Sequence, residues 1–262
     1  MASNPAGKRS AAIPDVEWAH RVDLAAFYRI VAHMRWDEII FSHITLRLPG
    51  PERHFLINPF GMLYEEITAS SLVKIDIEGN VIDDTPWPIN KAGFVIHSAL
   101  HEAREDAHCV AHVHTTAGMA VAQQAAGLLS TNFYSASLYD KISYHDFEGS
   151  VVTPGEKVRL AQNLGSNNIL ILRNHGLLVC GPDVATTFST LFTLQRACET
   201  QIAAQACGSP LIDVPRDIRE AHRDALNQTI LDEPANDFSR VERLAFEAMV
   251  RRIERIDSSF RN

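Results

Sequence analysis

The run Cys109-Val-Ala-His-Val-His114 constrains the fold of this chain more than any other feature of its sequence. Its apolar residues have the length and composition of a buried β-strand, and successive side chains of a strand point to opposite faces of the sheet. His112 and His114 are two residues apart, so a strand points both imidazoles to one face. The run therefore predicts a buried strand that presents two imidazoles at its carboxyl end, where open α/β sheets bind their ligands.

His175, in the segment Arg173-Asn-His-Gly176, is a candidate for a third imidazole beside this pair. Three protein ligands and one position left for substrate are the arrangement expected of catalytic zinc, whereas structural zinc has four protein ligands. A His-x-His pair also arises by chance in a chain with 12 histidines among 262 residues. The pair alone leaves both interpretations open, and its structural context decides between them.

Two periodicities divide the chain into an early and a later part. After a helical pattern at residues 15–34, strand-like alternation continues as far as residue 82, with turn residues between the runs. Beyond this, helical and apolar strand patterns alternate at residues 92–104, 109–114, 115–126, 153–164, 168–172, 177–180 and 182–207. Thr115 and the capping box Thr153-Pro-Gly-Glu156 are placed to begin two of these helices. The patterns predict an α/β fold in which a mixed sheet has helices on both faces.

The chain is expected to have three segments. Residues 1–14 show no periodic pattern and are predicted to be a mobile tail. Residues 15–231 are predicted to form one domain, which is long enough to bury a core of its own. Residues 232–262 are predicted to form a short amphipathic helical extension.

Composition excludes several classes of function. The net charge is −8 and no basic stripe is present, so nucleic acid is not an expected partner. No apolar run approaches the roughly 18 residues of a transmembrane helix, and no hydrophobic stretch follows the N-terminus as in a secretory signal. The four cysteines are scattered without a Cys-x-x-Cys pair, as in a reduced protein. We therefore expect a cytoplasmic protein that binds neither nucleic acid nor a membrane.

Several motifs, taken together in their order and spacing, resemble the class II aldolase/adducin family over roughly residues 20–208. They are Phe41-Ser-His-Ile-Thr45, Asn58-Pro-Phe-Gly61, Val73-Lys-Ile-Asp76 with Gly79, His112-Val-His114 and Arg173-Asn-His-Gly176. The adducin-like branch is the most similar, through Ala92-Gly-Phe-Val-Ile-His97, Tyr144-His-Asp146 and residues 163–176.

The resemblance implies both a fold and a metal site. The expected fold is a three-layer α/β/α structure with a central mixed, largely antiparallel sheet. The expected ligands of a divalent metal ion are His112, His114 and His175, with zinc as the preferred ion and manganese or iron as alternatives. The expected assembly is a homotetramer with active sites at subunit interfaces.

One departure from the family concerns a carboxylate. Sugar-phosphate aldolases of the family carry Pro-Ser-Ser-Glu before the helix that begins here near Ala92, and its glutamate serves as general acid and base. This chain has Pro88-Ile-Asn-Lys91 there, and no acidic residue occurs between Asp84 and Glu102. We therefore expect no carboxylate base near the metal, which favours decarboxylation or a base-independent aldol cleavage.

A second departure concerns phosphate binding. The same aldolases surround the substrate phosphate with small hydroxyl and amide groups in two segments, where this chain has Ser42-His43-Ile44 and Asn58-Pro59-Phe60-Gly61. Apolar Ile44 and Phe60 would leave a phosphate dianion without partners, at a cost of about several kcal/mol. The sequence therefore predicts a substrate without phosphate.

Lys91 and His145 are the candidate catalytic residues besides the metal ligands. Lys91 could bind a substrate carboxylate, or act as an acid where the glutamate is missing, although a solvated surface charge is the ordinary role of lysine. His145 lies between Tyr144 and Asp146, and Asp146 could orient its imidazole toward the site. His97 and His101 share a helical face and are predicted to be core or subunit-contact residues.

Three classes of function remain open. The first is a metal-dependent carbon–carbon lyase that acts on a small non-phosphorylated hydroxy- or oxo-acid by aldol cleavage or decarboxylation, since a divalent ion can hold the developing negative charge. The second is a non-catalytic adducin-like assembly protein, although the basic tail of adducin has no counterpart in residues 232–262. The third is a non-haem iron oxygenase on the same fold.

Overall fold

The computed structural model describes residues 10, 13–149, 153–232 and 238–262. Its strands are β1 (His43–Arg47), β2 (Phe55–Ile57), β3 (Val73–Ile75), β4 (Cys109–Val113), β5 (Ile142–His145), β6 (Ile169–Leu172) and β7 (Gly176–Gly181). Its α-helices are α1 (Asp15–His33), α2 (Lys91–Ala103), α3 (Thr116–Ala122), α4 (Phe133–Ser137), α5 (Pro154–Leu164), α6 (Val184–Ala206), α7 (Arg216–Asp232) and α8 (Phe238–Ile256). Two short 3-10 helices, η1 (Tyr64–Glu66) and η2 (Ser258–Arg261), complete the described elements.

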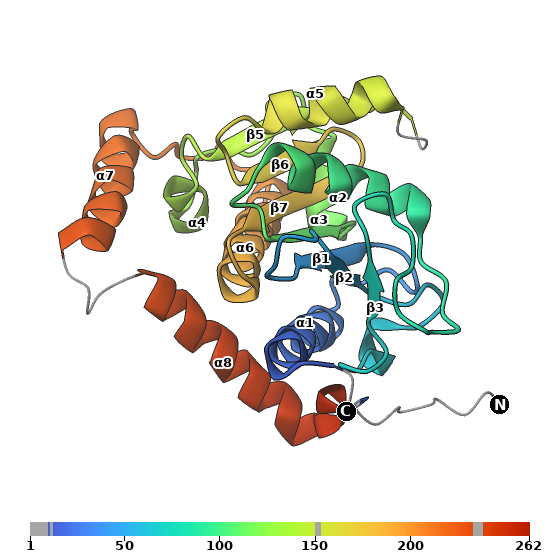
Figure 1. Cartoon of the computed structure of the whole chain (residues 1–262). Helices are drawn as coiled ribbons and strands as arrows, with labels where there is room; N and C mark the ends of the chain where they lie inside the picture. Colours follow the sequence, from blue (N-terminus) through green and yellow to red (C-terminus); the bar gives the residue numbers. More distant parts are fainter. Residues whose placement is uncertain (1–9, 11–12, 150–152, 233–237) are drawn as a thin grey trace.

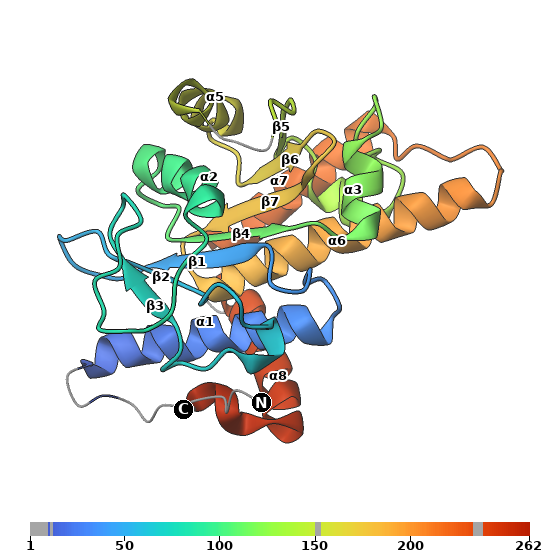
Figure 2. The same ribbon diagram turned by 90° about the vertical axis from the view of Figure 1, so that its right-hand side faces the viewer.

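The seven strands form one sheet in the order β3-β2-β1-β4-β7-β6-β5. Neighbouring strands are antiparallel except β5 and β6, which run parallel. Helices α2 and α5 lie over one face of the sheet, and α1, α6 and α8 lie over the other (Figure 1, Figure 2). The predicted three-layer α/β/α fold with a largely antiparallel mixed sheet is confirmed.

The alternation of side chains along the strands divides the core between the two faces. Ile44 of β1 and Ala111 of β4 pack toward α1 and α6, within the larger hydrophobic cluster. Val110 of β4 packs on the other face with Leu100 of α2 and Leu160 of α5, within a smaller cluster. The polar residues that alternate with the first set therefore face α2.

The register of β1 and β4 sets these polar residues side by side. His43 pairs with His112, and Thr45 pairs with Val110. The Thr45 hydroxyl lies 2.8 Å from His97 Nδ1 and 2.8 Å from His101 Nε2, both on α2. His97 and His101 are 0% exposed, so the prediction that they are core residues is confirmed.

Threonine caps begin two helices as predicted. The Thr115 side chain accepts a hydrogen bond from the Gly118 amide at the start of α3, and Thr153 accepts from the Glu156 amide at the start of α5. Helix α3 ends at Ala122, earlier than the predicted Ala126. The carbonyl of Gln124, beyond this end, accepts a hydrogen bond from the Arg173 guanidinium at 2.7 Å, which holds the chain in a turn instead of a further helical turn.

The C-terminal segment packs against the domain. Helix α8 contacts α6 and α1, and Phe246 and Ile253 on α8 are buried there. The Arg29 guanidinium lies 3.0 Å from the Asp257 carboxylate, which ties the end of α8 to α1. The predicted helix is present, but it covers one face of the core. Most of the predicted N-terminal tail lies outside the described residues, as does the boundary after Asp232, because 233–237 are not described.

No helix among the described residues is long and apolar enough to cross a membrane.

Tyr28 of α1 fastens the start of β1 to the end of β2. Its buried hydroxyl accepts hydrogen bonds from the amides of Ile44, at 2.8 Å, and Asn58, at 3.2 Å. Its proton is directed to the Ile44 carbonyl oxygen, and the Asn58 Oδ1 atom is a second acceptor at 3.0 Å. The neighbouring His43 side chain is therefore positioned from behind by α1.

Replacing Tyr28 with Phe should lower the free energy of unfolding by about 1–3 kcal/mol, because the substitution leaves buried backbone groups without a partner. Urea denaturation monitored by circular dichroism measures the change. The matched control is Tyr139→Phe, which removes a hydroxyl from the half-buried ring that packs beside Arg219. Equal small effects of the two substitutions would contradict the anchoring role of Tyr28.

Candidate functional site

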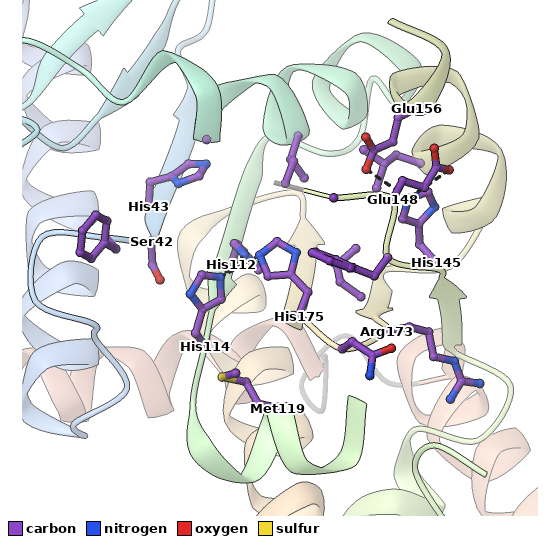
Figure 3. A pocket seen from close by; sticks show the side chains of 18 of the residues that line it. Ser42, His43, His112, His114, Met119, His145, Glu148, Glu156, Arg173 and His175 are labelled. Atoms are coloured by element: carbon purple, nitrogen blue, oxygen red, sulfur yellow. Dashed lines mark hydrogen bonds and ion pairs between the residues drawn. The ribbon is translucent and has the colours of Figure 1, made fainter. Parts of the chain in front are cut away.

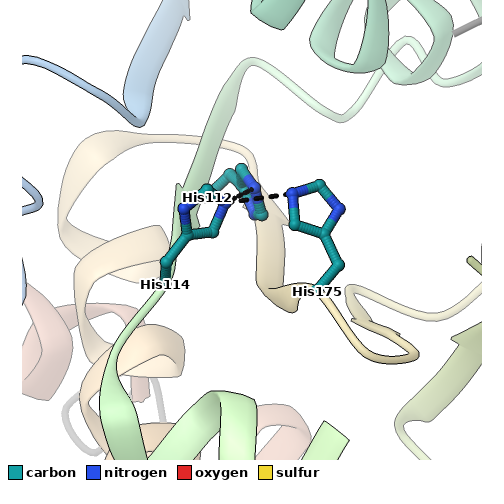
Figure 4. Close-up of side chains that lie close together, drawn as sticks. All are labelled: His112, His114 and His175. Carbon is teal, nitrogen blue, oxygen red and sulfur yellow. Dashed lines mark hydrogen bonds between the residues drawn. The ribbon is translucent and has the colours of Figure 1, made fainter. Parts of the chain in front are cut away.

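Three histidines converge beside the carboxyl end of β4. His112 is on β4, His114 directly follows it, and His175 lies in the turn between β6 and β7 (Figure 4). The Nε2 atom of His114 lies 2.8 Å from that of His112 and 3.0 Å from that of His175. The structure thus brings together the three histidines that the sequence singled out, from segments more than 60 residues apart.

The turn before β7 allows this convergence. Asn174 has a φ of +57°, in the left-handed region that asparagine tolerates, so the chain reverses tightly before His175. Gly176 follows, and a Cβ atom there would lie 2.6 Å from the Val113 carbonyl oxygen and 3.0 Å from Cδ2 of His114. Only glycine allows β7 to approach β4 so closely, and the approach carries His175 to the other two rings.

The outer nitrogens of two rings are held by protein acceptors. His112 Nδ1 lies 2.9 Å from the Leu177 carbonyl oxygen, which can only accept, so this nitrogen carries the proton. His114 Nδ1 donates to the Glu38 carboxylate in the same way. In the neutral form of each ring Nε2 is then unprotonated, and the Nε2 atom of His114 faces those of His112 and His175. Partners of this kind, behind a metal-binding histidine, fix its orientation and raise its basicity.

Burial keeps two of the three rings uncharged. It lowers the pKa of His112 well below the usual value for histidine, and the neighbouring His114 and His175 lower it further. Burial, followed by the proximity of His114, lowers the pKa of His175 to about 4. Near neutral pH, His112 and His175 therefore offer lone pairs without first losing a proton. A set of three imidazole nitrogens fits a divalent cation such as zinc.

The histidine cluster opens into a cavity of about 670 Å³, whose lining residues come from most of the sheet and from α2 and α5 (Figure 3). Its lining includes four carboxylates, those of Glu38, Asp146, Glu148 and Glu156. Among the described residues, Arg173 is the one Lys or Arg in this lining. Its guanidinium lies 4.3 Å from the centre of the Tyr144 ring and donates to the Gln124 carbonyl oxygen, so it is already engaged. The cavity is therefore acidic.

A second wall of the cavity is polar and neutral. Ser42 and His43 are 6% and 3% exposed, and the Oγ atom of Ser42 and both ring nitrogens of His43 have no hydrogen-bond partner. Burial lowers the pKa of His43 to about 4. A Cβ atom on Gly93 would lie 2.6 Å from Cε1 of His43, so the start of α2 closes against this ring. These groups can bind an uncharged oxygen of a ligand.

The structure places His43, and not Ile44, at the cavity wall. Ile44 was predicted to face the substrate, but it is 0% exposed and packs in the core on the opposite face of the sheet. Because β1 alternates, His43 takes the cavity position. Phe60 was also expected to face the substrate, but it packs beside Phe41 at a ring separation of 6.5 Å and is not part of the cavity lining.

The expectation of no carboxylate near the histidine cluster was also wrong. The segment 85–101 has no acidic residue, but Glu38 reaches His114 from the loop between α1 and β1. Glu148 and Glu156 enter the same cavity from the segment around α5. No spacing in the sequence relates these three residues to the histidines, because each contact depends on how distant segments pack.

The two candidate catalytic residues have different surroundings. The Lys91 side chain is exposed, and its Nζ atom lies 3.5 Å from Asn80 Oδ1, away from the cavity lining. His145 is 4% exposed and lines the cavity. Asn163 of α5, and not the exposed Asp146, holds its ring through a contact of 2.8 Å with Nδ1.

Comparisons with known proteins agree with this fold. The sequence profile of the class II aldolase and adducin N-terminal domain matches residues 22–202. A Pseudomonas aeruginosa protein whose name places it among the class 2 aldolases is 51% identical over 216 residues, which cover 82% of this chain and 83% of that protein. Mouse alpha-adducin is 44% identical over 208 residues, which cover 78% of this chain and 28% of adducin.

A solved structure gives a similar result. L-fuculose 1-phosphate aldolase from Glaciozyma antarctica has a TM-score of 0.79 and is 26% identical, with 98% of this chain and 97% of that chain covered. Together with the class 2 aldolase relative, this likeness supports an aldolase-like enzyme.

The convergence of the three rings predicts how metal content responds to substitution. His114→Ala removes the nitrogen nearest to both other ligands and should abolish most metal binding, as measured by emission spectroscopy on purified protein. Glu38→Gln keeps the three nitrogens but weakens the support of His114, so affinity should fall by about 10- to 100-fold. His33→Ala, at an exposed position on α1, is the control and should retain full metal content. Full content in a His112→Ala/His114→Ala double variant would refute the assignment.

Proposed function

Because the chain belongs to the class II aldolase and adducin family, we propose that it is a metal-dependent carbon–carbon lyase. Its substrate is a small non-phosphorylated hydroxy- or oxo-acid, cleaved by aldol cleavage or decarboxylation. The observation that carries this proposal is the convergence of three imidazole nitrogens at the wall of a cavity large enough for a small organic acid.

The proposed ligands of the metal are His112, His114 and His175. Zinc is the proposed ion, with manganese or iron as alternatives, because imidazole nitrogen suits all three. When bound, the ion would supply Lewis acidity toward two adjacent oxygen atoms of the substrate. Glu38 would hold the His114 ring in place through its Nδ1 proton.

The charge of the cavity supports a substrate without phosphate. A phosphate dianion would enter a space lined by four carboxylates, of which Arg159 pairs with Glu148, and the Arg173 guanidinium is engaged by Tyr144 and Gln124. Neutral His43 and Ser42 offer hydrogen bonds but no positive charge. A monoanionic acid whose carboxylate lies beside a divalent cation is better matched to this charge distribution.

His145 is the proposed acid–base residue of the reaction. In aldol cleavage a base takes the proton of the substrate hydroxyl as the carbon–carbon bond breaks, and in decarboxylation an acid protonates the carbon that loses carbon dioxide. His145 lines the cavity and can serve in either direction. Lys91 has no part in this proposal, because its side chain is directed to Asn80.

The similarity to alpha-adducin favours one alternative, a non-catalytic assembly protein. In that case the histidine cluster would be a structural remnant, since one fold can keep its shape after its chemistry is lost. The iron oxygenase alternative depends only on the same three nitrogen ligands, and the identity of the bound metal distinguishes it.

A homotetramer with active sites between subunits is the proposed assembly. Phe41 and Phe147 line the cavity and are 49% and 54% exposed in the single chain, which supports a neighbouring subunit over the cavity mouth. Light scattering should report four chains at micromolar concentration, and a monomer would contradict the assembly. The cytoplasmic location remains a prediction of the sequence.

The decisive assay compares two groups of substrates. Metal-loaded protein is given a panel of hydroxy- and oxo-carboxylic acids, and separately dihydroxyacetone phosphate with an aldehyde. We expect turnover only in the first group, and loss of at least about 100-fold in His114→Ala because the cation no longer binds. Turnover of the phosphate alone would overturn the proposed substrate class. Inertness toward both groups, with metal bound, would support the assembly alternative.

A further inference from the structure

The wall of the cavity formed by β5 and α5 contains an ionisable pair, His145 and Glu156 (Figure 3). His145 ends β5, and Glu156 lies in the first turn of α5. They are 4% and 5% exposed, so both side chains are almost entirely removed from water. His145 Nε2 lies 3.6 Å from the nearer carboxylate oxygen, Glu156 Oε1.

Asn163 holds the His145 ring and leaves Nε2 to face Glu156. The Asn163 side-chain amide lies 2.8 Å from His145 Nδ1. An amide presents its NH2 group as a donor or, after a half-turn, its oxygen as an acceptor, so this contact is compatible with the neutral ring and with the protonated ring. Nε2 and the Oε2 atom of Glu156 are both buried without a hydrogen-bond partner.

Two carboxylates lie near this nitrogen, but only one of them has a cation of its own. Glu148 Oε1 is 3.9 Å from His145 Nε2, and Arg159 binds both oxygens of Glu148, with Nε at 2.7 Å from Oε1. That contact with Arg159 holds the pKa of Glu148 below its usual range. Among the described residues, His145 is the one basic group within ion-pair distance of Glu156.

The other charged groups around His145 are engaged elsewhere or face solvent. Arg173, at the end of β6, donates its backbone amide to the His145 carbonyl oxygen and places its guanidinium over Tyr144. Lys157 of α5 lies 3.8 Å from Glu102 of α2. Asp146 is exposed.

Glu156 stands at the capping-box position of α5, but its carboxylate does not cap the helix. In a full capping box its carboxylate would bind the Thr153 amide, but only the Thr153 half of the box forms. The carboxylate faces His145 and the cavity instead. A buried carboxylate without a cation is costly, and so is a buried imidazolium, whereas one proton shared between the two groups satisfies both.

We propose that Glu156 and His145 share one proton and act together as the acid–base pair of this cavity. Glu156 is the positioning residue, and its carboxylate stabilises the protonated form of His145. The inference rests on the proposed function for its chemistry. In aldol cleavage, the pair begins as a neutral imidazole and a carboxylate, takes the proton of the substrate hydroxyl and then shares it, while the O–H electrons form the new carbonyl group. The electrons of the broken carbon–carbon bond remain on the other fragment, which takes that same proton from the pair. Atoms and charge balance without a further reactant.

Titration of His145 tests the pair without any substrate. Side-chain nuclear magnetic resonance of the metal-loaded protein, with His145→Gln used to assign the signal, gives the pKa of His145. Glu156→Gln should lower this pKa by about one unit or more, because, of the two carboxylates near His145 Nε2, it removes the one that no guanidinium neutralises. Glu148→Gln is the matched control at a similar distance, and it should change the pKa much less. Equal shifts in the two variants, or none in Glu156→Gln, would overturn the proposal.

Two further measurements complete the test. Glu156→Asp keeps the negative charge, so the pKa of His145 in this variant should stay close to its wild-type value. This variant also serves if Glu156→Gln does not fold. A pKa of His145 well below the wild-type value in Glu156→Asp would count against the pair. On an acid that the wild type turns over, Glu156→Gln should lower kcat by about 10²- to 10⁴-fold and move the pH profile, with partial rescue in Glu156→Asp. A pKa shift without lyase turnover in the wild type would refute the proposed function and leave the shared proton intact. Turnover with no pKa shift would refute the pair alone.

Discussion

The close approach of β7 to β4 is the constraint on which the rest of the site depends. Gly176 has no room for a side chain against the Val113 carbonyl oxygen, and this contact brings the preceding turn against the end of β4. His175 then meets His112 and His114, although about 60 residues separate the two segments. The same approach brings the Leu177 carbonyl oxygen to His112 Nδ1, so one backbone contact both gathers the rings and fixes a tautomer.

The closeness of the three imidazole rings determines part of the electrostatics of the cavity. Three imidazoles this close cannot all be protonated, and burial already lowers the pKa of His112 and His175. His112 and His175 therefore contribute no positive charge, while Glu38 brings negative charge to the same space. A bound divalent cation would offset that charge, so the acidic lining and the imidazole donors are complementary features of one site.

Much of this arrangement could be predicted from local sequence signals. The two-residue spacing of His112 and His114 identified their common face, and the threonine caps marked two helix starts correctly. Strand alternation predicts that His43, and not Ile44, faces the cavity, whereas similarity of motif order places Ile44 there. Glu38 could not be found in this way, because its contact with His114 depends on a loop packing against a strand 76 residues away.

Unsatisfied polar atoms show where the fold departs from what stability alone would favour. Among the described residues, ten buried side-chain nitrogen or oxygen atoms have no partner, and five of them belong to Ser42, His43, His145 and Glu156, which all line the cavity. Each such atom costs about 1–3 kcal/mol unless something satisfies it. Apolar side chains of similar size would remove that cost and keep α2 and α5 packed on the sheet. Their concentration on two walls around the histidine cluster is therefore explained by a polar ligand in the cavity and by the proton exchange of His145 and Glu156, and not by the requirements of folding.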